Sequence, residues 1–155
     1  HESRLNGRFA QNRITRVIPD EANGYRTVAI DLNPHILLAA QPDARELGLA
    51  QPLDLVFQPY GREAYVAVFG SRKVGVVDGV GKIIDRIGVG FGPGGLALDP
   101  KRQRLYVLNH LDATISIVDT GKRRSIGAVA LRHDPTPAII KQGRPFFFDA
   151  ALTSR

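Results

Sequence analysis

The chain has 155 residues, of which 43% are hydrophobic and 23% charged, a size and balance typical of one globular domain rather than of a disordered segment. It contains no cysteine, which excludes disulfides, thiolate metal sites and cysteine nucleophiles within the chain. The net charge of +6 comes from scattered basic residues with no interleaved aromatic residues, and the apolar runs are short, so we predict neither nucleic-acid binding nor a membrane span.

Residues 1–32 are expected to contain the last two strands of a repeating unit, because two apolar stretches recur 101 positions later. The matches are Ile14 with Ile115, Val17 with Val118, and Val28-Ala29 with Val129-Ala130. A turn of sequence PDEANGY separates the two predicted strands. Residues 33–51 fit no part of the repeat, and we interpret them as an insertion loop.

Residues 52–92 and 93–136 repeat one another at an offset of 41 positions without a gap. The identical positions are Pro52 and Pro93, Leu55 and Leu96, Pro59 and Pro100, Tyr65-Val66 and Tyr106-Val107, and Val77-Asp78 and Val118-Asp119. Each unit contains four short runs rich in Val, Ile, Leu and Tyr, separated by Gly, Pro and Asp. The expected strands lie at 53–57, 64–69, 74–78 and 83–89, and again at 96–99, 105–109, 114–119 and 125–131.

Four antiparallel strands that recur every 40 to 45 residues are typical of a β-propeller blade. The predicted fold class is therefore all-β, a partial β-propeller with four-stranded antiparallel blades. A closed propeller needs roughly four to eight blades, and fewer would leave sheet edges exposed. We expect this chain to be a fragment of a larger ring, completed by the rest of the propeller or by another chain.

The stretch GVGFGPGGLALDP, residues 88–100, contains Gly90, Gly92 and Gly95 in the spacing G-x-G-x-x-G, with Asp112 about 20 positions later. A dinucleotide-binding fingerprint requires a helix to begin at this loop, so that the helix amides face the pyrophosphate. Here the residues after the last glycine are expected to form a strand. We therefore interpret the loop as the turn between two blades and predict no cofactor-binding or catalytic residues in the chain.

Asp78 and Asp119 end matching strands of the two units, and a repeated aspartate there is expected to fix a turn by accepting backbone amide hydrogens. Among the histidines, His35 lies in the insertion and His110 follows a strand of the second blade. Loops at one face of a propeller converge on its central channel, so these two are the candidate metal ligands, although the sequence contains no H-x-x-H or H-x-x-x-H spacing.

Residues 137–155 restart the repeat pattern, with Pro137 in the place of Pro52 and Gly143-Arg144 in that of Gly61-Arg62, if about three residues are deleted. We expect either the start of a next blade or a junction to a downstream domain. Phe146, Phe147 and Phe148 form an apolar run that is expected to lie in the core or in an interface with the following domain.

The two units resemble the YVTN-type repeats of bacterial β-propellers. Tyr106, Val107 and Asn109 match the motif, with Leu108 in place of Thr, whereas in the earlier unit only Tyr65 and Val66 match. The stretch 134–155, DPTPAIIKQGRPFFFDAALTSR, resembles the junction at which such propellers run into a cytochrome c domain of the di-haem peroxidase or methylamine-utilisation type. The resemblance implies haem c in an adjoining domain and a place in the periplasm or at the cell surface.

The leading hypothesis is a non-catalytic propeller that serves as a scaffold or docking module for a haem domain or redox partner in extracytoplasmic electron transfer. Two alternatives stay open. One is a propeller redox enzyme that holds a cofactor or metal in its central channel. The other is a cell-surface assembly or adhesion module whose rings associate through sheet edges.

Overall fold

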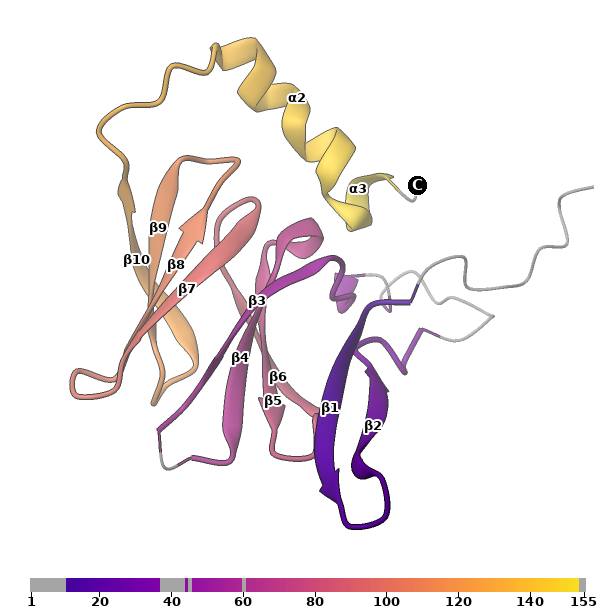
Figure 1. Ribbon diagram of the computed structural model, residues 1–155. Helices are drawn as coiled ribbons and strands as arrows, with labels where there is room; N and C mark the ends of the chain where they lie inside the picture. The colour runs from indigo at the N-terminus through magenta and orange to yellow at the C-terminus, as the bar shows by residue number, and fades with distance from the viewer. Residues whose placement is uncertain (1–10, 37–43, 45, 60, 154–155) are drawn as a thin grey trace, which may run out of the picture.

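The computed structural model describes residues 11–36, 44, 46–59 and 61–153, which form three antiparallel sheets (Figure 1). The first sheet contains β1 (Arg13–Asp20) and β2 (Gly24–Asp31). The second contains β3 (Pro52–Phe57), β4 (Glu63–Val68), β5 (Lys73–Asp78) and β6 (Ile83–Gly88). The third contains β7 (Pro93–Asp99), β8 (Arg104–Asn109), β9 (Thr114–Asp119) and β10 (Arg124–Ala130).

Each four-stranded sheet is a meander in which strands that follow one another in the sequence are hydrogen-bonded neighbours. The predicted fold class, a partial β-propeller with four-stranded antiparallel blades, is confirmed. We call β3–β6 the first blade and β7–β10 the second blade. The innermost strands β3 and β7 lie against each other, so β6 and β10 are the outermost strands.

The backbone repeats with the same period as the sequence. All four strands of the second blade begin 41 positions after their counterparts in the first blade. Left-handed backbone recurs at the same offset: φ is +56° at Gln51 and +67° at Gly92, and +50° at Arg72 and +51° at Ala113. The 41-residue repeat is therefore a repeat of strand positions and of the backbone at the link before the inner strand and at the turn between the second and third strands.

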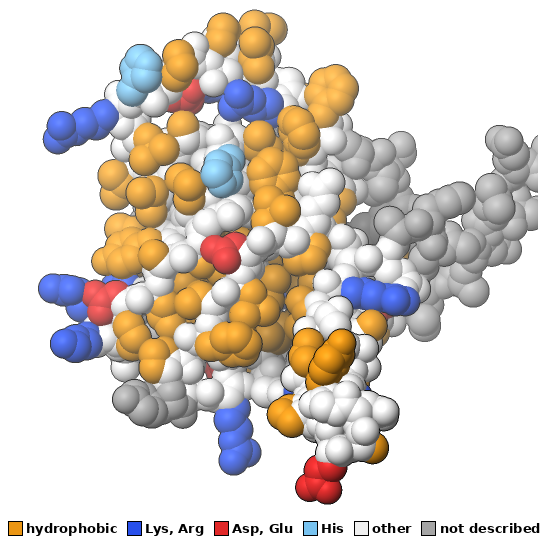
Figure 2. Space-filling model, viewed as in Figure 1, with side chains coloured by type: hydrophobic (Ala, Val, Ile, Leu, Met, Phe, Trp, Pro, Cys, Tyr) orange, Lys and Arg blue, Asp and Glu red, His pale blue; other side chains and the backbone are white. Residues whose placement is uncertain are grey.

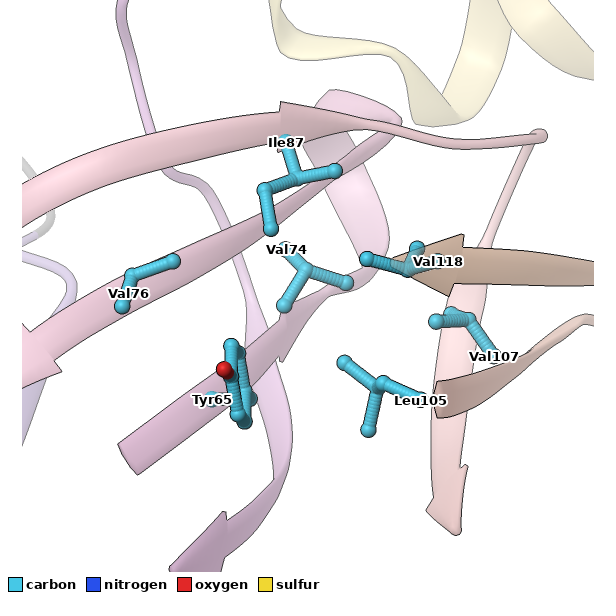
Figure 3. Close-up of a cluster of buried hydrophobic side chains, with 7 residues drawn as sticks. All are labelled: Tyr65, Val74, Val76, Ile87, Leu105, Val107 and Val118. Atoms are coloured by element: carbon cyan, nitrogen blue, oxygen red, sulfur yellow. The ribbon is translucent and has the colours of Figure 1, made fainter. Parts of the chain in front are cut away.

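The main hydrophobic core lies between the two blades (Figure 3). Alternate residues of a strand point to opposite faces of its sheet. Tyr65 of β4 and Val74 and Val76 of β5 lie on the face of the first blade that is turned toward the second blade. The fully or almost fully buried members of this cluster are Tyr65, Val74, Val76 and Ile87 from the first blade and Leu105, Val107 and Val118 from the second. Adjacent blades thus hold each other by apolar contact.

The opposite face of the first blade packs against the N-terminal sheet. Ile14 of β1 contacts a buried cluster formed by Ala64, Val66 and Val77. Beside it, Leu32 and Leu49 are completely buried with Val68 of β4. The side-chain amide of Asn33 bonds the backbone of Leu49 in both directions, at 2.8 and 2.7 Å, which ties together the two described ends of the 33–51 insertion.

The turns after β5 and β9 are built as the sequence predicts. Asp78 Oδ1 accepts hydrogen bonds from the amides of Val80 and Lys82 at 3.0 and 2.8 Å. Asp119 Oδ1 accepts one from the amide of Lys122 at 2.9 Å, while its other oxygen lies 3.1 Å from Arg104 Nη1. The turn-fixing role expected for the repeated aspartate is confirmed.

The C-terminal segment does not restart a blade. For residues 137–155 the sequence predicts either the start of a next blade or a junction to a downstream domain, and in the described part of this range the structure has two helices, α2 (Ala138–Phe148) and α3 (Ala150–Thr153). The strand alternative fails because the apolar residues do not alternate: the pair Ile139-Ile140 recurs seven positions later at Phe146-Phe147, the spacing of two helical turns. In the described part of the chain, no helix is long and apolar enough to cross a membrane.

Candidate docking surface at one end of the blades

The helices α2 and α3 lie across one end of the blades, above the 3₁₀ turn η2 (Phe69–Ser71) that joins β4 to β5 (Figure 1). The 3₁₀ turn ends at Arg72, whose left-handed backbone directs the chain into β5. This end of the molecule also carries the β8–β9 turn. The helical segment therefore reaches both blades, and we call it the helical strap.

Three contacts fix the strap to the blades. The ring of Phe148 meets that of Phe69 edge-on, with centroids 5.9 Å apart. Asp149 Oδ2 lies 2.7 Å from Arg72 Nε, and Arg144 Nη1 donates a hydrogen bond of 3.2 Å to the carbonyl of Leu111 in the β8–β9 turn. The first two contacts reach the first blade and the third reaches the second, so the strap bridges them.

The ion pair between Arg72 and Asp149 has one buried partner. The Asp149 side chain is 3% exposed, and its Oδ1 also accepts the amide of Ala151 at 2.9 Å, which orients the start of α3. The guanidinium of Arg72 stacks over Phe91, 4.8 Å from the ring centroid. A charge in this position is neutralised on one side by the pair and is covered on the other by an aromatic face.

A hollow of about 320 Å³ opens beside this ion pair, lined by Glu46, Ser71, Lys73 and Asp149 among others. Lys73 Nζ donates to the carbonyl of Ser71 at 3.3 Å. Burial lowers the pKa of Lys73 below its ordinary value, and the nearby Asp149 acts in the opposite direction. The hollow thus holds charges of both signs that already compensate one another.

The outward face of α2 is strongly apolar. Ile139 is 76% exposed, Phe146 68% and Phe147 81%, whereas Phe148 is turned toward Phe69. Figure 2 shows hydrophobic side chains along the upper rim of the molecule, where α2 lies in Figure 1. The three phenylalanines proposed from the sequence as interaction residues therefore divide: Phe148 anchors the strap, and Phe146 and Phe147 are presented outward. An exposed helix face of this kind is typical of a partner surface.

The strap begins at a second charged contact. Asp134 Oδ2 lies 2.6 Å from Lys141 Nζ, and Oδ1 accepts the amide of Thr136 at 3.0 Å. The hydrogen bond from Lys141, followed by those from Thr136, lowers the pKa of Asp134 to about 2.

This pKa predicts how the strap responds to acid. A carboxyl whose pKa is lowered by folding contributes stability that is complete above its unfolded pKa, near 4, and is lost as the pH falls through its folded pKa. We therefore expect the contact between Asp134 and the start of α2 to persist at pH 4 and to be lost as the pH approaches 2. A carboxyl ¹³C titration by NMR should give a midpoint near 2 for Asp134. In Lys141→Gln the midpoint should move up toward 4, and an unmoved midpoint would contradict the assigned cause.

The glycine-rich loop joins β6 to β7, and a strand rather than a helix follows it. The helix N-terminus that a dinucleotide fingerprint requires is replaced by β7 (Pro93–Asp99). The loop is instead bonded to the β8–β9 turn: the amide of Phe91 donates to Asp112 Oδ2 at 2.6 Å, and that of His110 donates to the carbonyl of Gly92 at 2.9 Å. Asp112 therefore fixes the link between the blades.

Gly90 has no room for a side chain. A Cβ there would lie 2.6 Å from both Asn109 Nδ2 and Asp112 Oδ2, and Asn109 is completely buried and bonded to Ser116 at 2.8 Å. Gly90→Ala should lower the free energy of unfolding by about 1 kcal/mol or more, because a fixed amide must shift. Gly88→Ala is the matched control, since a Cβ at Gly88 meets nothing within 4 Å. Urea denaturation measures both, and equal losses would contradict the steric account.

The two candidate metal ligands lie in different parts of the molecule. His35 Nε2 is 3.1 Å from the carbonyl of Ala44, in a hollow lined by Ile30 of β2 and Arg86 of β6. His110 lies against Gly94, at the start of the inner strand β7. The structure thus does not bring the two imidazoles into one hollow. Within the described ranges, no three His, Cys, Asp or Glu side chains are grouped so that they could hold a metal ion.

Sequence reasoning missed the anchors Phe69, Arg72 and Arg144 as site residues. A signal for two of them exists, because the first blade departs from the repeat there: Phe69 stands opposite His110 at the 41-residue offset, and Arg72 opposite Ala113. Residues that break a repeat while the backbone keeps it are candidates for contacts outside the repeat.

Comparison with known proteins supports the fold. No known protein family and no curated protein matches the sequence. AztD from Citrobacter koseri is 18% identical with a TM-score of 0.55 over 83% of this chain and 32% of that protein, and its apo form gives 0.54 over 81% and 30%. Hydrazine synthase from Kuenenia stuttgartiensis is 24% identical with a TM-score of 0.51 over 54% of this chain and 24% of that one. The chain thus spans a quarter to a third of the length of these β-propeller proteins.

Proposed function

We propose that the chain is a non-catalytic β-propeller module of the YVTN type that serves as a scaffold and docking surface for a c-type haem domain in an extracytoplasmic protein. The helical strap is the observation that carries this proposal. It is fixed to both blades by Phe148, Asp149 and Arg144, while Phe146 and Phe147 face outward where a following domain would contact them. The resemblance of residues 134–155 to the junction with a cytochrome c domain supplies the kind of partner.

The haem of this proposal belongs to the adjoining domain. Covalent attachment of haem c uses the two thiols of a Cys-x-x-Cys-His motif, and the chain has no cysteine. Its own residues therefore do not fit the group, and no step of haem chemistry is assigned to them. They form a pair of blades with an apolar helix face at one end, and this face would hold the haem domain in place.

The proposal is tested on the parent protein. The reading frame should encode Cys-x-x-Cys-His soon after Arg155, and the protein secreted to the periplasm should show the reduced absorption bands of haem c. Replacing both cysteines of that motif should abolish the bands and leave the β-sheet circular dichroism of the blades unchanged. A parent protein without the motif, or without covalently bound haem, would contradict the proposal.

The docking role is tested in the same protein by proteolysis. The double change Phe146→Ser and Phe147→Ser should speed cleavage between the strap and the following domain about fivefold, because an apolar contact that shields the link is lost. Val80→Ser is the matched control, since Val80 is also exposed but lies in the turn between β5 and β6. Equal cleavage rates in both variants would show that the two phenylalanines do not contact the domain.

A further inference from the structure

The N-terminal sheet occupies the place of the outer half of a blade. At the offset of 101 positions, β1 corresponds to β9 and β2 to β10. In the second blade β9 pairs with β10 on one side and with β8 on the other. Within the described residues, β1 pairs with β2 alone. The backbone edge of β1 that corresponds to the β8 side of β9 is therefore open.

A groove of about 410 Å³ lies between β1 and the first blade. Its floor includes Leu55, Phe57, Ala64 and Val77, and its wall includes Val17. Phe57 is 73% exposed and Leu55 36%, although both lie on the inner strand of a blade. Within the described residues, the positions equivalent to β7 and β8 are thus unfilled beside β1, and Leu55 and Phe57, which would face them, are exposed. We call this groove the inner groove.

The chain contains its own template for what fills the inner groove. Tyr65 is completely buried between the blades, where the second blade contributes Leu96, Leu98, Leu105, Val107 and Val118 to the same core. The residues 41 positions before these five are Leu55, Phe57, Ala64, Val66 and Val77. Four of them line the inner groove and the fifth, Val66, is buried behind it. The inner groove therefore has the composition and position of a face that receives a tyrosine from the neighbouring blade.

We propose that the inner groove binds a β-hairpin with the inner-strand pattern of the repeat, which pairs with the open edge of β1 and places an aromatic side chain on the floor. The register follows from the second blade, where Leu105 pairs with Val118, Val107 with Ser116 and Asn109 with Thr114. Shifted by 101 positions, the hairpin residues equivalent to these three lie opposite Val17, Thr15 and Arg13. This inference does not depend on the haem-docking proposal.

The occupant is a separate hairpin segment and not a second folded copy of the chain. In a folded copy, the two inner strands of each blade are already hydrogen-bonded within a complete four-stranded sheet. Such a copy would have to open a blade before it could donate an inner hairpin. Main-chain hydrogen bonds along β1 would supply affinity, and the alternating side chains would supply specificity.

The test uses a synthetic peptide of residues 93–109 as the hairpin and the full chain as its partner. Because the chain lacks cysteine, a single introduced pair reports one contact. A peptide with cysteine in place of Val107 should form a disulfide with Thr15→Cys and not with Arg16→Cys, since neighbouring residues of a strand point to opposite faces. Tyr106→Asp in the peptide should weaken binding about tenfold or more, measured by fluorescence anisotropy. Equal cross-linking at both positions, or equal binding of both peptides, would overturn the proposal.

A fusion keeps the test decisive if the free peptide folds poorly. Placing residues 93–113 directly before Arg13 reproduces the spacing of the second blade and raises the local concentration of the hairpin. This fusion should melt about 4–8 °C higher than the same fusion carrying Tyr106→Asp in the added hairpin. Equal melting temperatures would overturn the proposal. Light scattering of the unfused chain tests whether a second copy fills the inner groove. If the chain forms dimers and the peptide prevents their formation, a second copy occupies the groove, and the proposal of a hairpin occupant is overturned.

Discussion

Replacing Tyr65 with alanine should lower the free energy of unfolding by about 3–5 kcal/mol, whereas the same change at its repeat partner Tyr106 should cost about 1 kcal/mol or less. Tyr65 and Tyr106 occupy the same position of the 41-residue repeat, on β4 and β8. Tyr65 is completely buried because the second blade covers it, but Tyr106 is 36% exposed on the open face of that blade. Local sequence and strand position are matched, so the difference measures the contact between blades.

Urea denaturation followed by circular dichroism measures both variants, with the free energies extrapolated at a common slope. Truncation of Tyr65 leaves a cavity lined by Val74, Val76 and Leu105, and such a cavity adds to the lost transfer free energy. Equal destabilisation by the two variants would mean that the blades fold without mutual burial. If only the Tyr106 variant lost stability, the stabilising contact would lie on the outer face of the second blade and not between the two blades.

The blades could be predicted from the sequence because the information is periodic. The recurrence of Pro52 at Pro93 and of Asp78 at Asp119 marks the ends of equivalent strands, and the structure begins β3 and β7 at those prolines. Each aspartate fixes its own turn through neighbouring amides, so its role depends only on local sequence. Repetition then shows which turns belong together.

The helical strap could not be predicted in the same way, because what holds it is not local. Arg72 and Asp149 are 77 positions apart and meet only once the blades have formed. The two repeat matches that suggested a strand at 137–155 depended on a three-residue deletion. They were outweighed by the seven-residue recurrence of apolar pairs, which is a helical period. Pro145 within α2 also removes an amide that a central strand would need.

The inner groove and the outward face of α2 are both open apolar surfaces, and they differ in how well this chain defines their partners. The inner groove faces a position for which the second blade is a template, so both the register and the side chains of the occupant follow. The outward face of α2 has no counterpart in the repeat. Its partner is specified only by the resemblance of the strap to a haem-domain junction. Because the outward face of α2 depends on the strap being held in place, the contribution of the Arg72–Asp149 ion pair to docking of the strap should be measured.

Arg72→Gln should increase the fraction of molecules with an undocked strap about 30-fold. The change leaves the Asp149 carboxylate, 3% exposed, without its cation at 2.7 Å, and it removes the guanidinium from the face of Phe91. The cost is about 2 kcal/mol, reduced from the value for a fully buried pair because the Arg72 side chain is 46% exposed. Glutamine keeps much of the stem, so the loss reports on charge and stacking rather than on size.

Hydrogen exchange read by mass spectrometry should show this change as faster exchange confined to residues 138–153, with β4 and β5 unchanged. Arg102→Gln is the matched control: its ion pair with Asp99, three residues away, is exposed, and its loss should leave exchange in the strap unaltered. The double variant Arg72→Gln with Asp149→Asn should recover part of the protection, because the buried charge is then gone as well. If Arg72→Gln speeds exchange throughout the first blade instead, Arg72 stabilises the β4–β5 connection, and the strap is held by Phe148 and Arg144 alone.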